Sequence, residues 1–299
     1  MRIRKAGKIA DGLWYLGRDE AGTYLLEGDK GSILINGALT GILPDVLKQM
    51  GEFGLDPGKI DKLLILHSHF DHIGIVPYFK RTFPKIEVLA SQRAWEILSM
   101  PKAIDIANKF SKIVAEKLGV TGLEKYDMDW RDDVAGRVLA EGDMIDLGGK
   151  TLKIMETPGH TACSISAYEP DMKALFPSDA MGIPYRDIVF PSANTDFTQY
   201  QGTLERYRPL PVSYMCADHY GFVTGEEAGR FAEMTIGEAR RMRAEMEDIY
   251  RSKGDLDAAA RAITEEFYRQ NPDYFISSDI LEGVFKQIVK YLAKNMQAS

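Results

Sequence analysis

The sequence predicts an α/β fold followed by a helical C-terminal extension, and two patterns indicate this. Short β-type apolar runs, separated by glycine-bearing turns and amphipathic stretches, recur over the first 221 residues. From residue 222 to residue 299 the apolar residues instead recur every three or four positions, which is typical of helices. No Pro/Ser-rich linker precedes residue 222. We therefore expect a core over 1–222 and a three-helix extension over 223–299 that packs on it.

The first 90 residues predict strands with two helices between them. β-type runs over 13–16, 23–26 and 32–35 indicate a meander. An amphipathic segment over 43–53 that ends before Gly54 predicts a helix. A strand over 62–66, a short helix around 76–79 and a β-run over 86–90 complete this part.

Residues 91–119 change to helical periodicity and predict an insert of one or two helices. β-type runs then return, with a predicted helix over 197–208; the runs are 137–139, 144–147, 151–155, 164–168, 174–176 and 212–216. In the extension, Thr224 and Glu227 match the spacing of a capping box, and Gly254 ends the helix that follows. Further helices are expected over 256–270 and from about 278.

The stretch His67-Ser68-His69-Phe70-Asp71-His72 holds three of the five histidines, directly after the apolar run 63–66. Imidazole and carboxylate are the usual ligands of zinc, iron and manganese. A solvated polar loop is the alternative interpretation. The position of this pattern at the end of a predicted strand favours a metal-binding loop.

The other two histidines and one aspartate also follow predicted strands. These residues complete two groups of ligands: His67, His69 and His160 for one ion, Asp71, His72 and His219 for a second, and Asp179 as a bridge. We therefore predict two divalent ions, zinc or iron, with manganese as a further candidate. A hydroxide shared by the ions would be the nucleophile, and Asp71 would act as the catalytic group that orients it and passes a proton to the leaving group.

The HxHxDH motif and the later His, Asp and His at strand ends resemble the metallo-β-lactamase superfamily over about residues 10–221. The resemblance implies an αββα sandwich with the site along one edge, and hydrolase activity. Asp179, where the antibiotic-hydrolysing zinc enzymes have Cys, implies a general hydrolase. His69, with no Glu at the ligand positions, differs from the oxygen-reducing flavodiiron branch and argues against redox chemistry. Asn36 replaces the usual Asp, and we expect it to hydrogen-bond to the ligand loop without adding charge.

Within the superfamily, the insert and tail are similar to the 2-aminobenzoylacetyl-CoA thioesterase branch of the alkylquinolone pathway. The matching stretches are 67–78, 88–91, 179–182 and 275–283. In that branch the last helix closes over the metals and contacts the acyl group. The resemblance thus implies a thioesterase for an acyl-CoA-type substrate with a hydrophobic or aromatic acyl group, with Met181, Leu281 and Val284 as substrate-binding residues. A last helix that only packs or dimerises is the alternative.

Other functions remain open: a lactonase, a glyoxalase-II-type enzyme, a phosphodiesterase, or a regulatory protein that acts through its helical surface. The net charge of −7 and the absence of a basic arm favour a small-molecule substrate over a nucleic acid. No signal peptide or bilayer-length apolar stretch is visible, so we expect a cytoplasmic protein without a membrane partner. A homodimer is left open. Cys163 and Cys216 form no disulfide framework.

Overall fold

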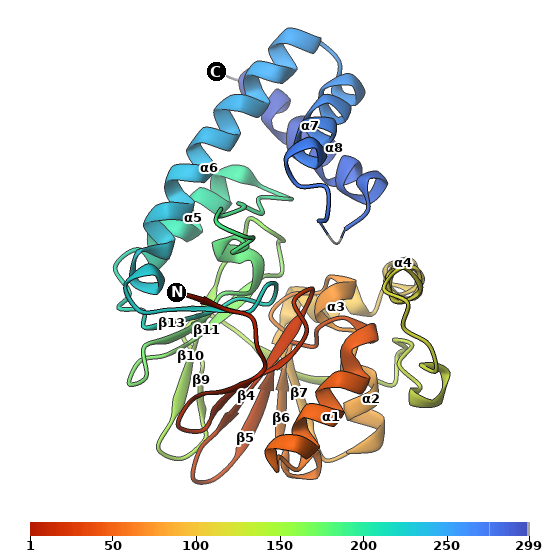
Figure 1. Ribbon diagram of the computed structural model, residues 1–299, viewed down its shortest axis with the longest axis vertical. Helices are drawn as coiled ribbons and strands as arrows, with labels where there is room; N and C mark the ends of the chain where they lie inside the picture. Colours follow the sequence, from red (N-terminus) through yellow and green to blue (C-terminus); the bar gives the residue numbers. More distant parts are fainter. Residues whose placement is uncertain (275, 298–299) are drawn as a thin grey trace.

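The computed structural model describes residues 1–274 and 276–297, and in it two β-sheets pack face to face with helices on both outer faces (Figure 1). Buried apolar residues fill three layers, one between the sheets and one beneath the helices on each side. The predicted αββα sandwich is thereby confirmed. Phe275, which belongs to one of the resembling stretches, and residues 298–299 of the predicted extension lie outside the described residues.

The N-terminal sheet has the strand order β2-β3-β4-β5-β6-β7-β8. Its strands are β2 (Gly7–Ala10), β3 (Leu13–Gly17), β4 (Gly22–Glu27), β5 (Ser32–Ile35), β6 (Lys62–Leu64), β7 (Glu87–Ser91) and β8 (Gly136–Leu139). The first four form the predicted antiparallel meander, whereas β5 to β8 pair in parallel. Because parallel strands end at the same edge, the loops after β5, β6 and β7 meet there.

The second sheet has the order β1-β14-β13-β12-β11-β10-β9. Its strands are β1 (Arg2–Ile3), β9 (Met144–Asp146), β10 (Thr151–Glu156), β11 (Ile165–Glu169), β12 (Ala174–Phe176), β13 (Tyr214–Cys216) and β14 (Phe222–Thr224). Arg2 pairs with Val223 across more than 200 residues, and no local pattern predicted β1, β2 or β14. The predicted boundary at residue 222 therefore falls inside β14.

Helices cover the outer faces of both sheets. One face carries α1 (Leu43–Phe53), α2 (Val76–Thr82), α3 (Gln92–Leu98) and α4 (Pro101–Lys117), and the other carries α5 (Phe197–Tyr207) and α6 (Glu226–Lys253). Gly54, in a left-handed conformation, ends α1 as expected. The helical insert predicted over 91–119 consists of two helices, α3 and α4.

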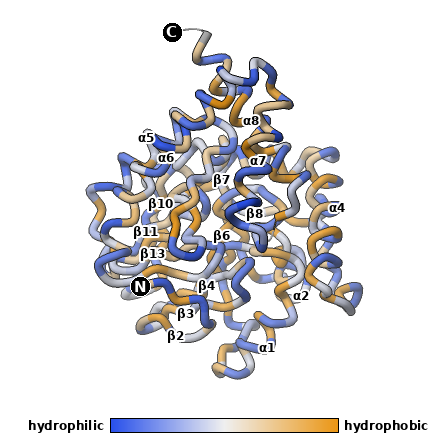
Figure 2. Tube along the Cα trace, turned by 45° about the horizontal axis from the view of Figure 1, so that its top comes forward, coloured by the Kyte–Doolittle hydropathy of each residue, from blue (hydrophilic) through white to orange (hydrophobic). Residues whose placement is uncertain are grey.

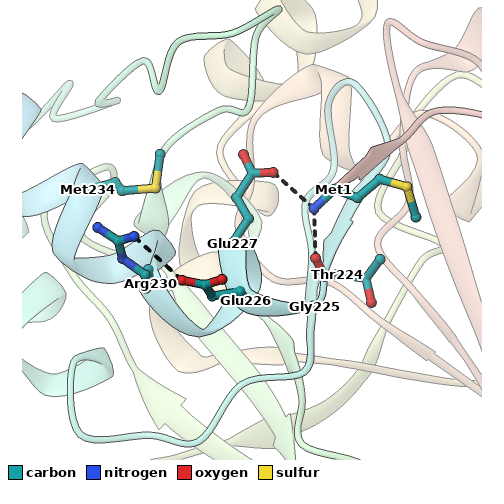
Figure 3. Close-up of a pocket in the computed structure, with 7 residues that line it drawn as sticks. All are labelled: Met1, Thr224, Gly225, Glu226, Glu227, Arg230 and Met234. Atoms are coloured by element: carbon teal, nitrogen blue, oxygen red, sulfur yellow. Dashed lines mark hydrogen bonds and ion pairs between the residues drawn. The ribbon is translucent and has the colours of Figure 1, made fainter.

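The start of α6 differs from the predicted capping box. Its N-cap residue is Gly225, and no side chain caps the helix there. Glu227 instead pairs with the amino group of Met1 and with Nε of Arg2, which draws its carboxylate toward β1 (Figure 3). The prediction was wrong because a tertiary ion pair competes with the local cap.

The last two helices, α7 (Leu256–Gln270) and α8 (Ser278–Gln297), lie with α6 at one end of the sandwich, above α4 in Figure 1. Figure 2 shows hydrophobic and hydrophilic residues alternating along α4 and α8. The buried stripe of α8, which includes Phe285, Ile288 and Leu292, packs against α7. Between these helices, Asp273 pairs with Arg186 and accepts a hydrogen bond from Tyr185 Oη at 2.7 Å. None of the described helices is long and apolar enough to cross a membrane.

Candidate metal centre

The loop with the first four predicted ligands leaves the carboxyl end of β6. The strand ends at Leu64, two residues earlier than predicted, and Phe70–His72 form a short 3-10 helix. The loop is held by backbone hydrogen bonds, from Gly37 N to His72 O at 2.9 Å and from Gly74 N to Ala38 O at 2.7 Å. The turn after β5 therefore holds the C-terminal end of the HxHxDH motif in place.

His160 reaches the same edge from the loop after β10. The preceding Gly159 has φ +128°, and a Cβ there would lie 2.2 Å from the backbone nitrogen of Tyr200 in α5. The carbonyl of Gly159 also accepts hydrogen bonds from the amides of Thr195 and Asp196. Only glycine permits this close approach of the loop to α5, and the approach places His160 over the sheet edge.

The first group of ligands brings three ring nitrogens together. Nε2 of His67 lies 3.2 Å from Nδ1 of His69, and Nε2 of His160 lies 3.2 Å and 3.1 Å from those two atoms. Ligand nitrogens 2.0–2.1 Å from zinc in a tetrahedral site would be about 3.3 Å apart. The three nitrogens thus fit one face of a metal-coordination tetrahedron.

The second group consists of Asp71, His72 and His219. Nε2 atoms of the two histidines lie 3.2 Å apart, and Oδ2 of Asp71 lies 3.7 Å from His72 Nε2 and 3.6 Å from His219 Nε2. His219 follows β13, and its Nδ1 donates to the carbonyl of Glu20 at 2.5 Å. This donation directs Nε2 toward the other two ligands.

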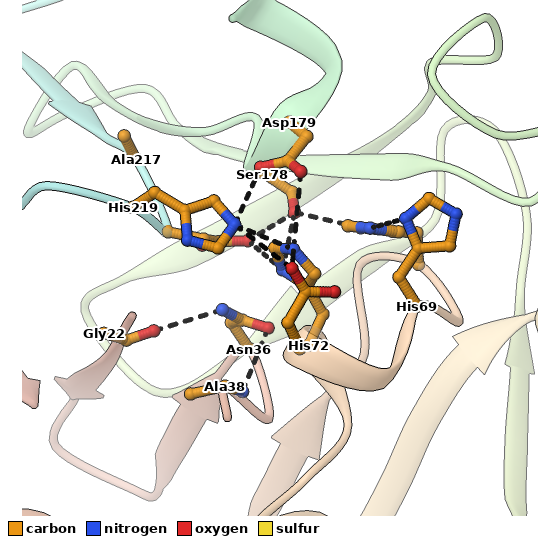
Figure 4. A network of polar contacts seen from close by, with 12 residues as sticks. Gly22, Asn36, Ala38, His69, His72, Ser178, Asp179, Ala217 and His219 are labelled. Carbon is orange, nitrogen blue, oxygen red and sulfur yellow. Dashed lines mark hydrogen bonds and ion pairs between the residues drawn. The ribbon is translucent and has the colours of Figure 1, made fainter. Parts of the chain in front are cut away.

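Asp179 lies between the two groups (Figure 4). Its Oδ2 is 3.4 Å from His72 Nε2 and 3.5 Å from His160 Nε2, whereas its Oδ1 is 3.6 Å from His219 Nε2. The structure thus brings all seven predicted ligands together, with the carboxylate of Asp179 close to histidines of both groups.

Three residues that contact the ligand histidines were not singled out from the sequence: Ser178, Ser192 and Asp218. The carbonyl of Ser192 accepts from His160 Nδ1 at 2.7 Å. Ser178 contacts His67 Nδ1, and Asp218 contacts His72 Nδ1. Ser178 and Asp218 each directly precede a ligand in the sequence, which is the one signal that could have indicated them.

Burial sets the protonation of the first group. Desolvation lowers the pKa of His67, His69 and His160, that of His69 to about 3, and for His67 and His69 the neighbouring histidines lower it further. Desolvation also acts on His72, but the carboxylates of Asp179 and Asp71 outweigh it and raise its pKa. Burial favours protonation of Asp179, yet His72 and His219 hold its pKa well below the usual range. Three neutral imidazoles are therefore ready to bind a cation.

The hydrogen bonds made by the side chain of Asn36 do not reach the ligand loop, contrary to our expectation. Its Nδ2 donates to the carbonyl of Gly22 at 3.1 Å, and its Oδ1 accepts from the amide of Ala38 at 3.3 Å (Figure 4). The residue is buried with φ +72°, so it shapes the turn after β5. The hydrogen bond to the ligand loop comes instead from the backbone amide of the next residue, Gly37.

A cavity of about 750 Å³ opens above the metal ligands. Its floor includes His69, Asp71, His160, Asp179 and His219, and its walls are formed largely by α3, α4 and α8. Two of the predicted substrate-binding residues, Leu281 and Val284, line this cavity. Met181 does not line it, because its side chain is buried in the core and its carbonyl accepts a hydrogen bond from Thr235 of α6.

The model of the metallo-beta-lactamase superfamily matches residues 17–219. A metallo-beta-lactamase fold-containing protein of Sulfurisphaera tokodaii is 27% identical over 68% of this chain and 74% of its own length. The human acyl-coenzyme A thioesterase MBLAC2 is 25% identical over 76% of this chain and 82% of its own. A metallo-beta-lactamase family protein of Thermus thermophilus has a similar fold, with a TM-score of 0.68 and 17% identity, over 96% of this chain and 95% of that one.

Coenzyme F420H(2) oxidase of Methanothermobacter thermautotrophicus is also related, at 27% identity over 60% of this chain. The match covers 42% of the oxidase, so this chain corresponds to less than half of that protein.

Proposed function

This chain belongs to the metallo-beta-lactamase superfamily and is a metal-dependent hydrolase, and from that premise we propose that it cleaves thioesters with an apolar or aromatic acyl group. The observation that carries the proposal is the cavity whose floor consists of metal ligands and whose walls are apolar. Such a site binds the reacting bond at the metals and the acyl group against the walls.

The ligand residues divide the work of metal binding. His67, His69 and His160 would hold one divalent ion, Asp71, His72 and His219 the other, and Asp179 would join them. Ions held here supply Lewis acidity and lower the pKa of water to near neutrality. The donor set suits zinc or iron, and manganese less closely because manganese prefers oxygen ligands.

Of the second group of ligands, we assign a role in proton transfer to Asp71 alone. Its carboxylate lies on the cavity floor, so it can accept a hydrogen bond from the attacking water and carry the proton to the leaving group. A thiolate needs little help of this kind because it is a good leaving group. A thioester therefore suits a site in which proton transfer is left to Asp71, a carboxylate on the cavity floor that is itself one of the predicted ligands.

The apolar walls favour a hydrophobic acyl group. The lining includes Ile106 and Phe110 of α4 and Ile280 and Val284 of α8. Ile106 is 44% exposed. Apolar surface left open beside a metal site gains about 25 cal/mol for each Å² that a ligand covers. The volume of about 750 Å³ admits an acyl group together with part of the thiol.

Few residues that line the cavity could bind the charged end of the substrate. Arg93 of α3 is the one lysine or arginine among the described residues that line the cavity. Its guanidinium is half exposed and pairs with Glu96 at 2.8 Å. A phosphate of coenzyme A could replace that carboxylate, so an acyl-CoA is the preferred substrate class. The similarity to an enzyme named acyl-coenzyme A thioesterase supports the same choice.

Kinetics on a panel of substrates test the proposal. The panel contains acyl-CoA thioesters with acetyl, octanoyl and benzoyl groups, glutathione thioesters, lactones and a phosphodiester, each measured with zinc-loaded and iron-loaded protein. We expect the highest kcat/KM for the octanoyl or benzoyl thioester. Turnover of lactones or phosphodiesters alone would contradict the thioesterase assignment. We further propose a cytoplasmic enzyme with a small-molecule substrate and no nucleic-acid or membrane partner.

A further inference from the structure

We infer that Ser178 and Asp218 link the two groups of metal ligands and act as positioning residues that make the binding of the two ions cooperative. The inference rests on the two-ion centre and not on the identity of the substrate. Neither residue is a metal ligand in the arrangement described above. Both are buried behind the histidines, on the side away from the cavity.

The link is a continuous chain of polar contacts. Nδ1 of His67, from the first group, lies 3.1 Å from Oγ of Ser178. Oγ of Ser178 donates a short hydrogen bond to Oδ2 of Asp218. The same Oδ2 lies 3.0 Å from Nδ1 of His72, from the second group. Two residues thus connect one histidine of each group.

The direction of each hydrogen bond follows from the chemistry of the groups. An ionised carboxylate only accepts, so the hydroxyl proton of Ser178 and the Nδ1 proton of His72 both point to Asp218. A serine has a single hydroxyl proton, so His67 must donate its Nδ1 proton to Ser178. With a metal bound, each ring would therefore carry its single proton on Nδ1 and present Nε2, the atom that faces the other ligands, to the ion.

The burial of Asp218 and the backbone conformation of Ser178 both cost folding free energy, and another interaction must offset that cost. Asp218 is 1% exposed, and its Oδ1 has no hydrogen-bond partner among the described residues. Ser178 has φ +50°, a conformation that side-chain-bearing residues rarely adopt. A buried carboxylate is retained at such cost where nearby cations stabilise it, and the two predicted ions would do so.

Cooperativity follows because the chain of contacts is shared. An ion at His67 fixes the imidazole ring, and the ring then fixes the Ser178 hydroxyl and the Asp218 carboxylate. His72 is thereby oriented before the second ion arrives, so less ordering free energy is lost in the second step. The coupling must act equally in the reverse direction.

Titration of the metal-free protein with Zn²⁺ in competition with a chromophoric chelator tests the inference. The wild type should bind two ions with the second at least as tightly as the first. In Ser178→Ala the second ion should bind on the order of 10-fold more weakly, and in Asp218→Asn the ion at His72 should weaken by roughly 10–100-fold. Ser192→Ala is the matched control. Among the ligands Ser192 hydrogen-bonds only to His160, and the variant keeps the backbone carbonyl that accepts from Nδ1 of His160.

A second variant separates coupling from misfolding. Ser178→Gly also lacks the hydroxyl but tolerates φ +50°, so it should fold and still lose cooperativity. Thermal unfolding of each metal-free variant checks the fold. Two unchanged binding constants in Ser178→Gly, or a wild type that binds its two ions independently, would overturn the inference. Neither result depends on whether the enzyme cleaves thioesters.

Discussion

Oδ2 of Asp179 lies 3.4 Å from Nε2 of His72, at the point where the two groups of metal ligands meet. The same oxygen is 3.5 Å from Nε2 of His160, which belongs to the other group. One carboxylate oxygen therefore lies close to histidines of both groups, and the second oxygen, Oδ1, is 3.6 Å from Nε2 of His219.

Asp179→Asn should reduce the metal content from two ions per chain to about one. An amide offers one acceptor oxygen, so it cannot bind both ions in place of the carboxylate. We expect hydrolysis to fall by more than the roughly 10–100-fold that loss of an outer partner costs. Elemental analysis and kcat/KM measure both effects. The control is Asp187→Asn, on the exposed surface nearby, which should retain two ions and normal turnover.

Gly159→Ala should destabilise the protein by at least about 2 kcal/mol and displace His160. The new Cβ would lie 2.2 Å from Tyr200 N, and φ +128° is unfavourable for alanine. Urea unfolding and metal content are the measurements. Gly202→Ala is the matched control, because it lies in α5 with no atom near its Cβ position and should stabilise by up to about 1 kcal/mol. Equal effects of the two substitutions would contradict this account.

Asn36→Asp should lower stability by about 1–3 kcal/mol, although it introduces the acid that the superfamily usually has there. The aspartate has no donor for the carbonyl of Gly22, and its charge would be buried. The same turn carries Gly37, whose amide donates to the carbonyl of His72 in the ligand loop. A disturbed turn should therefore lower metal affinity as well. Asn108→Asp removes a comparable donor, to Trp130 O, from a residue that does not line the cavity, and should affect stability alone. Higher activity in Asn36→Asp would show that the turn adapts.

The metal-free protein should lose stability as pH falls below about 6.5. His67, His69 and His160 have lowered pKa values in the folded state, so the unfolded chain binds their protons first. Each such histidine contributes up to about 1.4 kcal/mol per pH unit in this range. His72 has a raised pKa and is protonated in both states below 6.5, so its contribution is lost only at higher pH.

Denaturant unfolding of chelator-treated protein between pH 4.5 and 8 measures this slope. In His69→Gln the slope should be smaller by one proton, because one of the three histidines is removed. A flat profile for the wild type would mean that these histidines are not desolvated in the metal-free state.

Val284→Trp should narrow the cavity and change the substrate preference. Val284 lines the cavity from α8, so a larger side chain takes space from the acyl group. We expect kcat/KM for octanoyl-CoA to fall by about 10-fold or more relative to acetyl-CoA, since a few methylenes are worth that much in a pocket. Lys290→Trp places the same side chain on the exposed face of α8 and should leave the ratio unchanged. A ratio altered equally by both would place the acyl group elsewhere.

Much of the site could be predicted from the sequence because its chemistry is carried by residue type and local position. Histidines and aspartates at the ends of apolar strands are few, and their ligand roles follow from the groups they carry. The helices α1 and α7 were predicted at their observed bounds for a similar reason, since apolar periodicity and terminal residues such as Gly54 are local signals.

The tertiary structure decided whatever depends on residues that are distant in the chain. Arg2 and Glu227 lie more than 200 positions apart, and their ion pair replaced the predicted cap of α6. The side chain of Asn36 donates to the carbonyl of Gly22 because strand pairing places this carbonyl beside it. Ser178 and Asp218 have no motif of their own, and their role is visible only where His67 and His72 meet them. The sequence alone determined which groups could bind metal, whereas packing decided what holds and surrounds them.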